Sequence, residues 1–353
     1  MRLAKLRATF PGHSLDAVLV SQSENRRYLS GFTGSAGWLV ISAERAVLAT
    51  DFRYFEQVGR ESQAFELAKI NRKFSDLLPD LLGELGVRRL GFESQDVTVD
   101  QLHTWSQAAA VEWVPLKETV EQIRAVKDEG EIEALRRSVA LTDAAFGHLL
   151  TVIRPGMTER EAAWEIEAYM RTHGASKVAF DLIVAAGPNG ALPHARPGDY
   201  AIRAGEPIVV DIGCAVDGYC SDMTRTFCLG QPEARYLEIW NVVLQAQKAA
   251  EEVIRAGTSG VDADAAARDR ITEAGYGEYF GHGLGHGVGL AVHEGPRASR
   301  LSEDRLEAGM ALTIEPGIYL PGEFGVRLED LVIIREEGVE ILTDTPKIPV
   351  IDR

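Results

Sequence analysis

The stretch PIVVDIGCAVDGYCSDMTRTF, residues 207–227, has the pattern of two antiparallel strands joined by a tight turn. Asp217-Gly218 at its centre is a strong signal for a two-residue hairpin turn. With the turn there, Val216 pairs with Tyr219, and the remaining residues pair outward in the same register. We therefore expect a β-hairpin whose register is determined by this turn.

In that register, Gly213 lies opposite Asp222, and Asp211 lies opposite Thr224. Asp211 and Asp222 then occupy one face of the sheet as diagonal neighbours, within about 8 Å of each other. Two acids in an otherwise apolar stretch destabilise a fold if they are buried without partners. A solvated face is the alternative, because antiparallel sheets often have one wet side.

A second stretch, GHGLGHGVGLAVHEGP at residues 281–296, alternates glycine with larger residues. In an extended strand, one face would carry only glycine, and the other would carry His282 and His286. Glycine weakens a strand, so the pattern favours a place where a ligand or another backbone segment approaches closely. A mobile glycine-rich loop is the alternative. Strict alternation turns His293 to the other face, so its participation requires a bend that begins at Ala291.

Single acids interrupt two further apolar stretches: Glu315 lies within LTIEPGIYLP and Glu329 within GVRLEDLVII. Alternation places Asp330 on the face opposite Glu329, so at most one of these two acids shares a site with the others. Arg327 lies on the face of Glu329 and could pair with it or with a substrate. A structural salt bridge is the alternative role for each acid.

Together these β segments supply four carboxylates and one imidazole, which belong to Asp211, Asp222, Glu315, Glu329 and His286. Carboxylates with one imidazole suit Mn²⁺, Co²⁺ or Zn²⁺ better than Ca²⁺. Four negative charges would balance two divalent cations, which together can activate a shared water and polarise a carbonyl. The predicted chemistry is metal-assisted hydrolysis, with His282 and His293 left for proton transfer or for hydrogen bonds to an oxyanion.

The size and composition of the chain limit its class. Its 353 residues exceed one ordinary core, which predicts two domains, and 45% hydrophobic with 25% charged residues is typical of soluble globular proteins. A net charge of −16 disfavours nucleic acid and anionic membranes as partners. We see no membrane-length apolar run and no signal-peptide pattern, and three cysteines make a poor disulfide framework. We therefore expect a cytoplasmic protein.

Secondary-structure patterns divide the chain into residues 1–125 and 126–353. Strands expected at 15–21, 38–49 and 64–70 alternate with helices at 76–86 and 98–109, which predicts an α/β unit followed by a connector at 115–127. In the second part, Asp128 and Glu131 resemble a capping pair at the start of a helix. Further helices are expected at 158–173, 233–255 and 262–274, and strands at 178–186, 207–228, 281–293, 310–320 and 325–335.

Four motifs, VVDIGCAVDGYCSDMTRTF, FGHGLGHGVGLAVHE, TIEPGIY and GVRLEDLVII, resemble in order the metal motifs of the pita-bread metallopeptidases. The resemblance covers residues 126–350 strongly and the N-terminal part more loosely. It implies an α+β fold, in which a curved antiparallel sheet covered by helices follows a smaller creatinase-like α/β domain. The most similar branch contains Xaa-Pro aminopeptidase (aminopeptidase P) and Xaa-Pro dipeptidase (prolidase).

The resemblance implies a role for each ligand of a two-metal site. Asp211 would bind one metal ion, His286 and Glu315 would bind the other, and Asp222 and Glu329 would bridge both. Mn²⁺ is the expected metal, with Co²⁺ or Zn²⁺ as alternatives. Glu315 would also accept the proton of the attacking water.

Five further residues match pocket positions of the family. His293 matches a histidine that contacts the scissile peptide, and His194, in LPHARP, matches a histidine near the proline of the substrate. Judged without the resemblance, His194 is a turn residue. His282 matches another pocket histidine, and Tyr319 and Arg327 match positions that support the site and the substrate.

The N-terminal domain bears on the substrate. SGFTGSAG (30–37) followed by TDFRYFEQ (50–57) resembles the N-terminal domain of aminopeptidases P, and no charged residue lies between Gly31 and Ile41 to bind the carboxylate of a dipeptide. We predict an aminopeptidase that releases the first residue of Xaa-Pro-Xaa peptides, with prolidase as the alternative, which the short chain favours. The Xaa-Pro bond has no N–H, so the pocket must recognise ring shape, with Phe180 as a candidate wall alongside the histidines.

Other proteins of this fold fit less well. A metal-free peptide-binding module or a creatinase-like hydrolase should lack part of the ligand set, and methionine aminopeptidase does not account for the sizeable N-terminal domain. The resemblance also implies a homodimer in which the N-terminal domain reaches the site of the partner. The expected binding partners are short proline-containing peptides.

Overall fold

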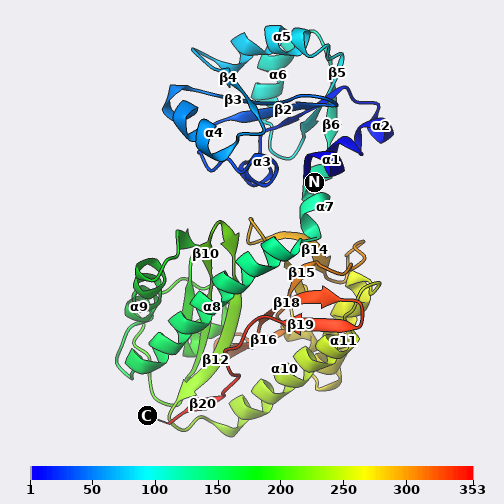
Figure 1. The fold of residues 1–353 in the computed structure, drawn as a ribbon. Helices are drawn as coiled ribbons and strands as arrows, with labels where there is room; N and C mark the ends of the chain where they lie inside the picture. The colour runs from blue at the N-terminus through cyan, green and yellow to red at the C-terminus, as the bar shows by residue number, and fades with distance from the viewer. Residues whose placement is uncertain (1, 353) are drawn as a thin grey trace. The chain divides into compact units, whose positions relative to one another are not determined.

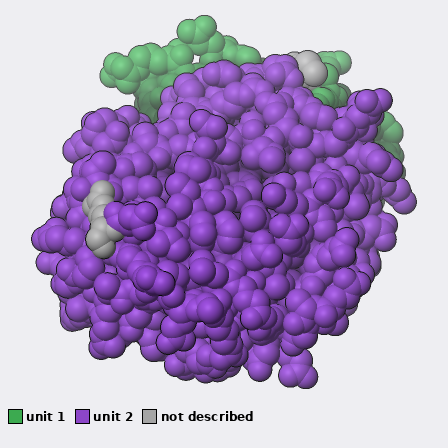
Figure 2. Space-filling view, turned by 90° about the horizontal axis from the view of Figure 1, so that it is seen from below, with its two compact units in different colours: residues 1–124 green, residues 125–353 purple. Residues whose placement is uncertain are grey.

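The computed structural model describes residues 2–352, and the chain separates into two compact units, residues 1–124 and 125–353 (Figures 1 and 2). Within residues 2–352, every helix is too short or too polar to span a lipid bilayer.

Residues 1–124 form one six-stranded sheet in the order β4-β3-β2-β1-β5-β6. The strands are β1 (Ala17–Val20), β2 (Trp38–Ser42), β3 (Ala46–Thr50), β4 (Glu66–Lys69), β5 (Arg89–Glu93) and β6 (Glu112–Leu116). The β1–β2 and β2–β3 pairs are antiparallel, and the other pairs are parallel. The single strand predicted at 38–49 is therefore wrong, because residues 43–45 turn the chain into a hairpin.

Helices cover both faces of this sheet (Figure 1). They are α1 (Arg2–Arg7), α2 (Phe10–His13), α3 (Ser23–Ser30), α4 (Phe55–Glu61), α5 (Phe74–Glu84), α6 (Val99–Ala108) and α7 (Thr119–Ala125). Phe74 of α5 and Trp105 of α6 pack with Leu19 and Val40 of the sheet in one buried cluster. The connector predicted at 115–127 is wrong in part, since it contains helix α7.

Four long helices accompany the strands of residues 125–353: α8 (Glu129–Val152), α9 (Glu159–Thr172), α10 (Ala234–Val253) and α11 (Gly260–Glu273). The predicted capping pair at the start of α8 is confirmed, because Asp128 and Glu131 each accept a hydrogen bond from the backbone of the other. Helices α8 and α9 share one apolar core with strands of the first half of this unit, and α10 and α11 share another with later strands.

The strands of this unit are short and divided among several small sheets. They are β7 (Lys177–Val178), β8 (Ile183–Ala186), β9 (Pro207–Ile212), β10 (Cys214–Val216), β11 (Tyr219–Cys220), β12 (Met223–Leu229), β13 (Gly285–Gly287), β14 (Glu294–Ala298), β15 (Ala311–Ile314), β16 (Gly317–Leu320), β17 (Phe324–Arg327), β18 (Asp330–Arg335), β19 (Gly338–Ile341) and β20 (Val350–Ile351). The sheets are β11-β10-β7, β20-β12-β9-β8, β13-β14, β15-β18-β19 and β16-β17. Apart from β12–β20, the pairs are antiparallel.

The hairpin register predicted from Asp217-Gly218 is confirmed. Val216 pairs with Tyr219 next to the turn, and Asp211 pairs with Thr224 further out. Both turn residues adopt positive φ, at 50° and 81°, as a tight hairpin turn of this kind requires.

Long strands predicted around the acidic residues are interrupted at those residues. Asp222 lies between β11 and β12, Glu315 lies between β15 and β16, and Glu329 lies between β17 and β18. The single strand predicted at 281–293 is also wrong, because only Gly285–Gly287 is extended before the chain turns back into β14. At these breaks the acids leave the strict alternation of a strand, so their side chains can converge from separate sheets.

Candidate metal centre

A cavity of about 660 Å³ lies within the unit formed by residues 125–353. Its walls contain carboxylates, imidazoles, guanidinium groups and a few apolar side chains. The residues that line it are Phe180, Asp181, Ile183, Pro193, His194, Ala195, Arg196, Asp211, Asp222, His282, Gly283, Gly285, His286, His293, Glu294, Arg297, Ser299, Glu315, Arg327 and Glu329.

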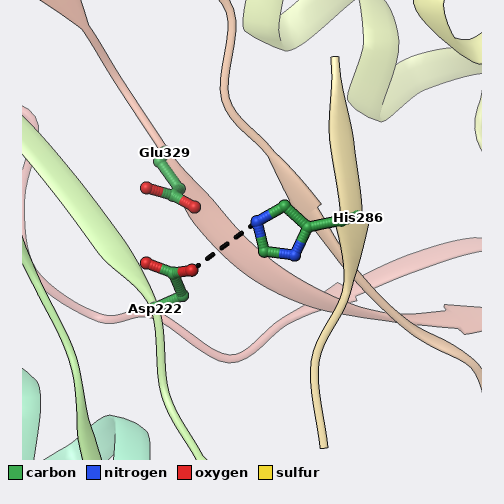
Figure 3. Close-up of side chains that lie close together, drawn as sticks. All are labelled: Asp222, His286 and Glu329. Atoms are coloured by element: carbon green, nitrogen blue, oxygen red, sulfur yellow. Dashed lines mark ion pairs between the residues drawn. The ribbon is translucent and has the colours of Figure 1, made fainter. Parts of the chain in front are cut away.

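Three side chains from separate segments of the chain converge on one point of this cavity (Figure 3). Asp222, His286 and Glu329 each offer a ligand atom, and these atoms all lie within 4.8 Å of one another. His286 Nε2 is 3.7 Å from Asp222 Oδ2. Asp222 and Glu329 are only 5% and 2% exposed, so their charges are removed from water. A group of this composition is suited to a divalent cation.

Two more acids flank this group. Glu315 Oε1 lies 3.4 Å from His286 Nε2 and accepts a hydrogen bond from Thr313 Oγ1 at 3.3 Å. Asp211 accepts a hydrogen bond from Arg327 at 2.5 Å through Oδ2, whereas its Oδ1 is buried without a hydrogen-bond partner among residues 2–352. The second oxygen of Asp211 is therefore available to a ligand.

Backbone contacts aim His286 at the acids. Its Nδ1 lies 3.1 Å from Gly287 O, which leaves Nε2 directed at the carboxylates, and its backbone N–H donates to Thr313 Oγ1. The glycines of this run allow that approach, since a Cβ on Gly285 would lie 1.9 Å from Thr313 O. The alternation of glycine thus reflects close contact with a neighbouring backbone, as predicted.

Burial controls the protonation of the cluster. Burial and repulsion by neighbouring carboxylates raise the pKa of Asp222 and of Glu329, and burial raises the pKa of Glu315 to about 8. Burial also lowers the pKa of His286 to about 4, which leaves the imidazole neutral and able to donate a lone pair. Acids that cannot all be charged together, beside a neutral imidazole, form a site that a cation would stabilise.

A second network of buried polar groups supports the site. Arg327, 4% exposed, donates to Thr224 Oγ1 at 3.0 Å and to Tyr319 OH at 2.8 Å in addition to Asp211. Tyr319 OH lies 2.8 Å from His282 Nε2. Thr224 Oγ1 in turn donates to Glu329 at 2.6 Å. Arg327 therefore links residues on both sides of the cavity.

His293 and His194 also line the cavity. The rings of His293 and His286 lie 4.4 Å apart, so the chain bends between them as the sequence requires. His194 is exposed, between the half-buried Pro193 and the buried Ala195. The structure brings every predicted site residue to this cavity except Tyr319, which contacts it through His282 and Arg327.

Sequence reasoning missed several groups of this region. Thr224 lies two residues after Asp222, and this spacing, typical of one face of an extended segment, is the signal that could have identified it. Arg297 and Asp181 line the cavity without belonging to any motif. The acid Glu159 was treated only as part of a helix, but it accepts hydrogen bonds from Ala186, Asn189 and Gly198 and so closes the loop that carries His194.

Comparisons with known proteins agree with this architecture. Residues 133–336 match metallopeptidase family M24, and residues 2–126 match the creatinase/prolidase N-terminal domain. The chain belongs to metallopeptidase family M24, and the predicted family and α+β pita-bread fold are confirmed.

Individual relatives are similar over nearly their whole length. The Xaa-Pro dipeptidase of Pyrococcus horikoshii is 38% identical, over 95% of this chain and 94% of that protein. The solved structure of an Xaa-Pro dipeptidase from Bacillus anthracis has a TM-score of 0.97 at 42% identity and covers 99% of both chains. An X-Pro aminopeptidase from Thermotoga maritima has a TM-score of 0.90 at 40% identity and covers 96% of this chain and 98% of that one.

Proposed function

We propose that this protein is a metal-dependent Xaa-Pro dipeptidase. The observation that carries the proposal is the convergence of Asp222, His286 and Glu329 in one cavity, with Asp211 and Glu315 beside them. The relatives from P. horikoshii and B. anthracis, which bear the name Xaa-Pro dipeptidase, favour this reaction over the aminopeptidase predicted first from the sequence.

The five predicted ligands line one cavity and fit a pair of divalent cations. Asp211 would hold one cation, His286 and Glu315 would hold the other, and Asp222 and Glu329 would contribute to both, with Mn²⁺ as the expected metal. The orphaned Oδ1 of Asp211 and the mutual repulsion of the acids support this assignment. Bound divalent cations supply a Lewis acid for the scissile carbonyl and make water a nucleophile near neutral pH.

The protein itself supplies proton transfer and orientation. Glu315 accepts the proton of the attacking water, and the hydrogen bond from Thr313 Oγ1 orients its carboxylate. His293 hydrogen-bonds the scissile peptide, and His194 and His282 contact the substrate from the other walls of the cavity. Arg327 and Tyr319 hold Asp211 and His282 in place through the hydrogen bonds described above.

The apolar part of the cavity fits a proline ring. Phe180, Ile183, Pro193 and Ala195 contribute surface without hydrogen-bond donors or acceptors in their side chains. The Xaa-Pro amide has no N–H to satisfy, so its nitrogen can face an apolar wall without leaving a donor unpaired.

The free carboxylate of a dipeptide lies one residue beyond the scissile bond and needs a cation in the same cavity. Arg297 and Arg196 both line the cavity and are exposed to solvent. A guanidinium group binds a carboxylate through two parallel hydrogen bonds. No charged residue lies between Gly31 and Ile41, and the two arginines of the catalytic unit are the candidates for this cation instead.

An Xaa-Pro aminopeptidase is the second candidate function. The similarity to the X-Pro aminopeptidase from T. maritima favours it, as does the uncharged segment between Gly31 and Ile41. The two functions differ in whether the cavity accepts a residue beyond proline.

A peptide panel in Mn²⁺ separates the two functions. Xaa-Pro, Xaa-Pro-amide, Xaa-Pro-Xaa and Met-Xaa substrates are assayed with and without chelator, and we expect chelator-sensitive cleavage of Xaa-Pro with little cleavage of the longer peptide. Release of the first residue from Xaa-Pro-Xaa at an equal or greater kcat/KM would establish the aminopeptidase. Chelator-resistant cleavage would contradict the metal assignment.

Two variants test the assigned roles. Arg297→Leu should raise KM for Xaa-Pro about tenfold or more and change the amide substrate much less, since an arginine–carboxylate pair is lost only for the free acid. Arg300→Leu, at an exposed arginine outside the cavity lining, is the matched control. Glu315→Gln should abolish turnover in a folded protein, and full activity would remove the proposed base.

We further propose a homodimer, which the family resemblance implies, and a cytoplasmic location, which the three unpaired cysteines favour. Light scattering that gives the mass of a single chain would remove the dimer.

A further inference from the structure

A buried ion pair lies beside His293, outside the proposed metal ligands. Lys127 Nζ is 2.9 Å from Glu294 Oε1, and the two side chains are only 1% and 6% exposed. Glu294 follows His293 directly in the chain, whereas Lys127 is 167 positions away. Removing one partner of such a pair leaves the other charge buried and uncompensated.

Lys127 is anchored by its own backbone. Its N–H donates to Gly309 O at 3.0 Å, and Val126 before it forms a β-bridge with Met310. Asp128 after it caps helix α8. The backbone that carries the Lys127 side chain is therefore fixed by contacts at the residue itself and on both sides of it.

The Glu294 carboxylate packs into the turn that precedes it. Its Oε2 accepts a hydrogen bond from Ala291 N at 3.3 Å, and Gly289 N donates to Ala291 O at 2.9 Å. A Cβ on Gly289 would lie 2.3 Å from Glu294 Oε1, so the carboxylate fills the space that this glycine leaves. The strand register shifts at the start of the same turn, between His286 and Gly287.

This turn sets the distance between a proposed metal ligand and a proposed substrate contact. His286 precedes the turn and His293 ends it, and their rings lie 4.4 Å apart. We propose that the Lys127–Glu294 ion pair is a positioning element for His293. The inference rests on the proposed function of this cavity.

The charge of Lys127 has a second consequence. Glu294 lines the same cavity as Asp211, Asp222, Glu315 and Glu329. An uncompensated Glu294 carboxylate there would be repelled by these acids and attracted to any cation they bind. The ammonium of Lys127 offsets that charge and keeps Glu294 on the turn.

The test uses the full chain loaded with Mn²⁺ and an Xaa-Pro dipeptide. Lys127→Met should lower kcat about tenfold to a hundredfold while KM changes less than about threefold, because a small misplacement of a catalytic contact has effects of this size. Lys127→Arg should recover most of the lost kcat. Arg171→Met, which removes an exposed ion pair with Glu167, is the matched control and should leave both constants unchanged.

Two further measurements separate positioning from general damage. In a His293→Ala background, Lys127→Met should have little additional effect on kcat, since both changes act through one group. An equal loss in that background, or an unchanged kcat in the single variant, would overturn the proposal. If Lys127→Met does not fold, the charge-free variant Lys127→Met/Glu294→Gln replaces it with the same expectations.

A readout independent of activity keeps the inference separate from the proposed function. Amide hydrogen exchange at residues 289–292 should be at least about tenfold faster in Lys127→Met, whereas exchange in helix α9 should not change. Unchanged exchange at 289–292 would contradict the positioning role even if the protein cleaves Xaa-Pro. A wild-type protein that cleaves no Xaa-Pro substrate would instead remove the proposed function.

Discussion

Replacing Arg327 by methionine tests the electrostatic argument for this site most directly. The guanidinium group is buried and donates to Asp211, Tyr319 and Thr224. The side chains of Arg327 and Asp211 are 4% and 13% exposed, so solvent cannot replace the lost partner. Arg327→Met leaves the Asp211 carboxylate buried, with its Oδ1 already unpartnered within residues 2–352.

The expected cost follows from that geometry. Breaking a buried ion pair by removing one partner destabilises a protein by about 3–5 kcal/mol. A folded domain is stable by only about 5–15 kcal/mol, so this one substitution should remove a large part of that stability. Arg327→Lys keeps the charge but not the planar fork, and should lose less.

Hydrogen exchange of the amides in β9 and β12 measures the effect in the full chain, because these strands carry Asp211 and Thr224. The metal-free protein is compared with the Mn²⁺-loaded protein. In the loaded protein we expect Arg327→Met to lower the opening free energy by less, because a bound cation also offsets the charge of Asp211. Arg171→Met is the control for an exposed pair and should change the opening free energy by less than about 0.5 kcal/mol. An Arg327→Met effect no larger than this control would refute the reasoning.

Two other substitutions test separate parts of the chain. Gly285→Ala places a Cβ 1.9 Å from Thr313 O and should lower the free energy of unfolding by about 2 kcal/mol or more in urea denaturation. Gly281→Ala, whose Cβ would have nothing within 4 Å, should change it by less than about 0.5 kcal/mol. Equal effects of the two substitutions would contradict a close approach of the backbone at Gly285. Burial raises the pKa of Glu93 from its usual 4.5 to about 7, so the folded state holds this proton more tightly than the unfolded state. The stability of residues 1–124 should therefore fall by up to about 3 kcal/mol as pH rises from 4.5 to 7, and Glu93→Gln should flatten this dependence when hydrogen exchange in α3 is measured across that range.

The elements that local chemistry specifies were predictable. The two-residue turn at Asp217-Gly218 determines the hairpin register, since its backbone geometry leaves one way to pair the flanking strands. The cap formed by Asp128 and Glu131 marks the start of α8 because both partners lie within one helical turn. Alternation also separated Asp330 from Glu329: Asp330 is buried on the other side, where it pairs with Arg225 at 2.7 Å.

Elements that depend on distant contacts were not predictable. The strand expected at 281–293 is broken where the Glu294 carboxylate folds back onto Gly289. The charge of Glu294 is compensated by Lys127, which is distant in the sequence. The segment at 38–49 carries the polar residues Ser42, Glu44 and Arg45 between two apolar runs, and the chain turns at 43–45. Its two strands then pair with β1 on one side and with β4 on the other.

The sequence by itself indicated the five candidate metal ligands and, through a local turn, the register of the strand pair that carries Asp211 and Thr224. Only the tertiary structure decided how closely those side chains approach and which cations oppose them. Arg327 and Asp211 are 116 positions apart, and Lys127 and Glu294 are 167 apart. Local backbone preferences act over a few residues, whereas such pairs form when packing removes both partners from water.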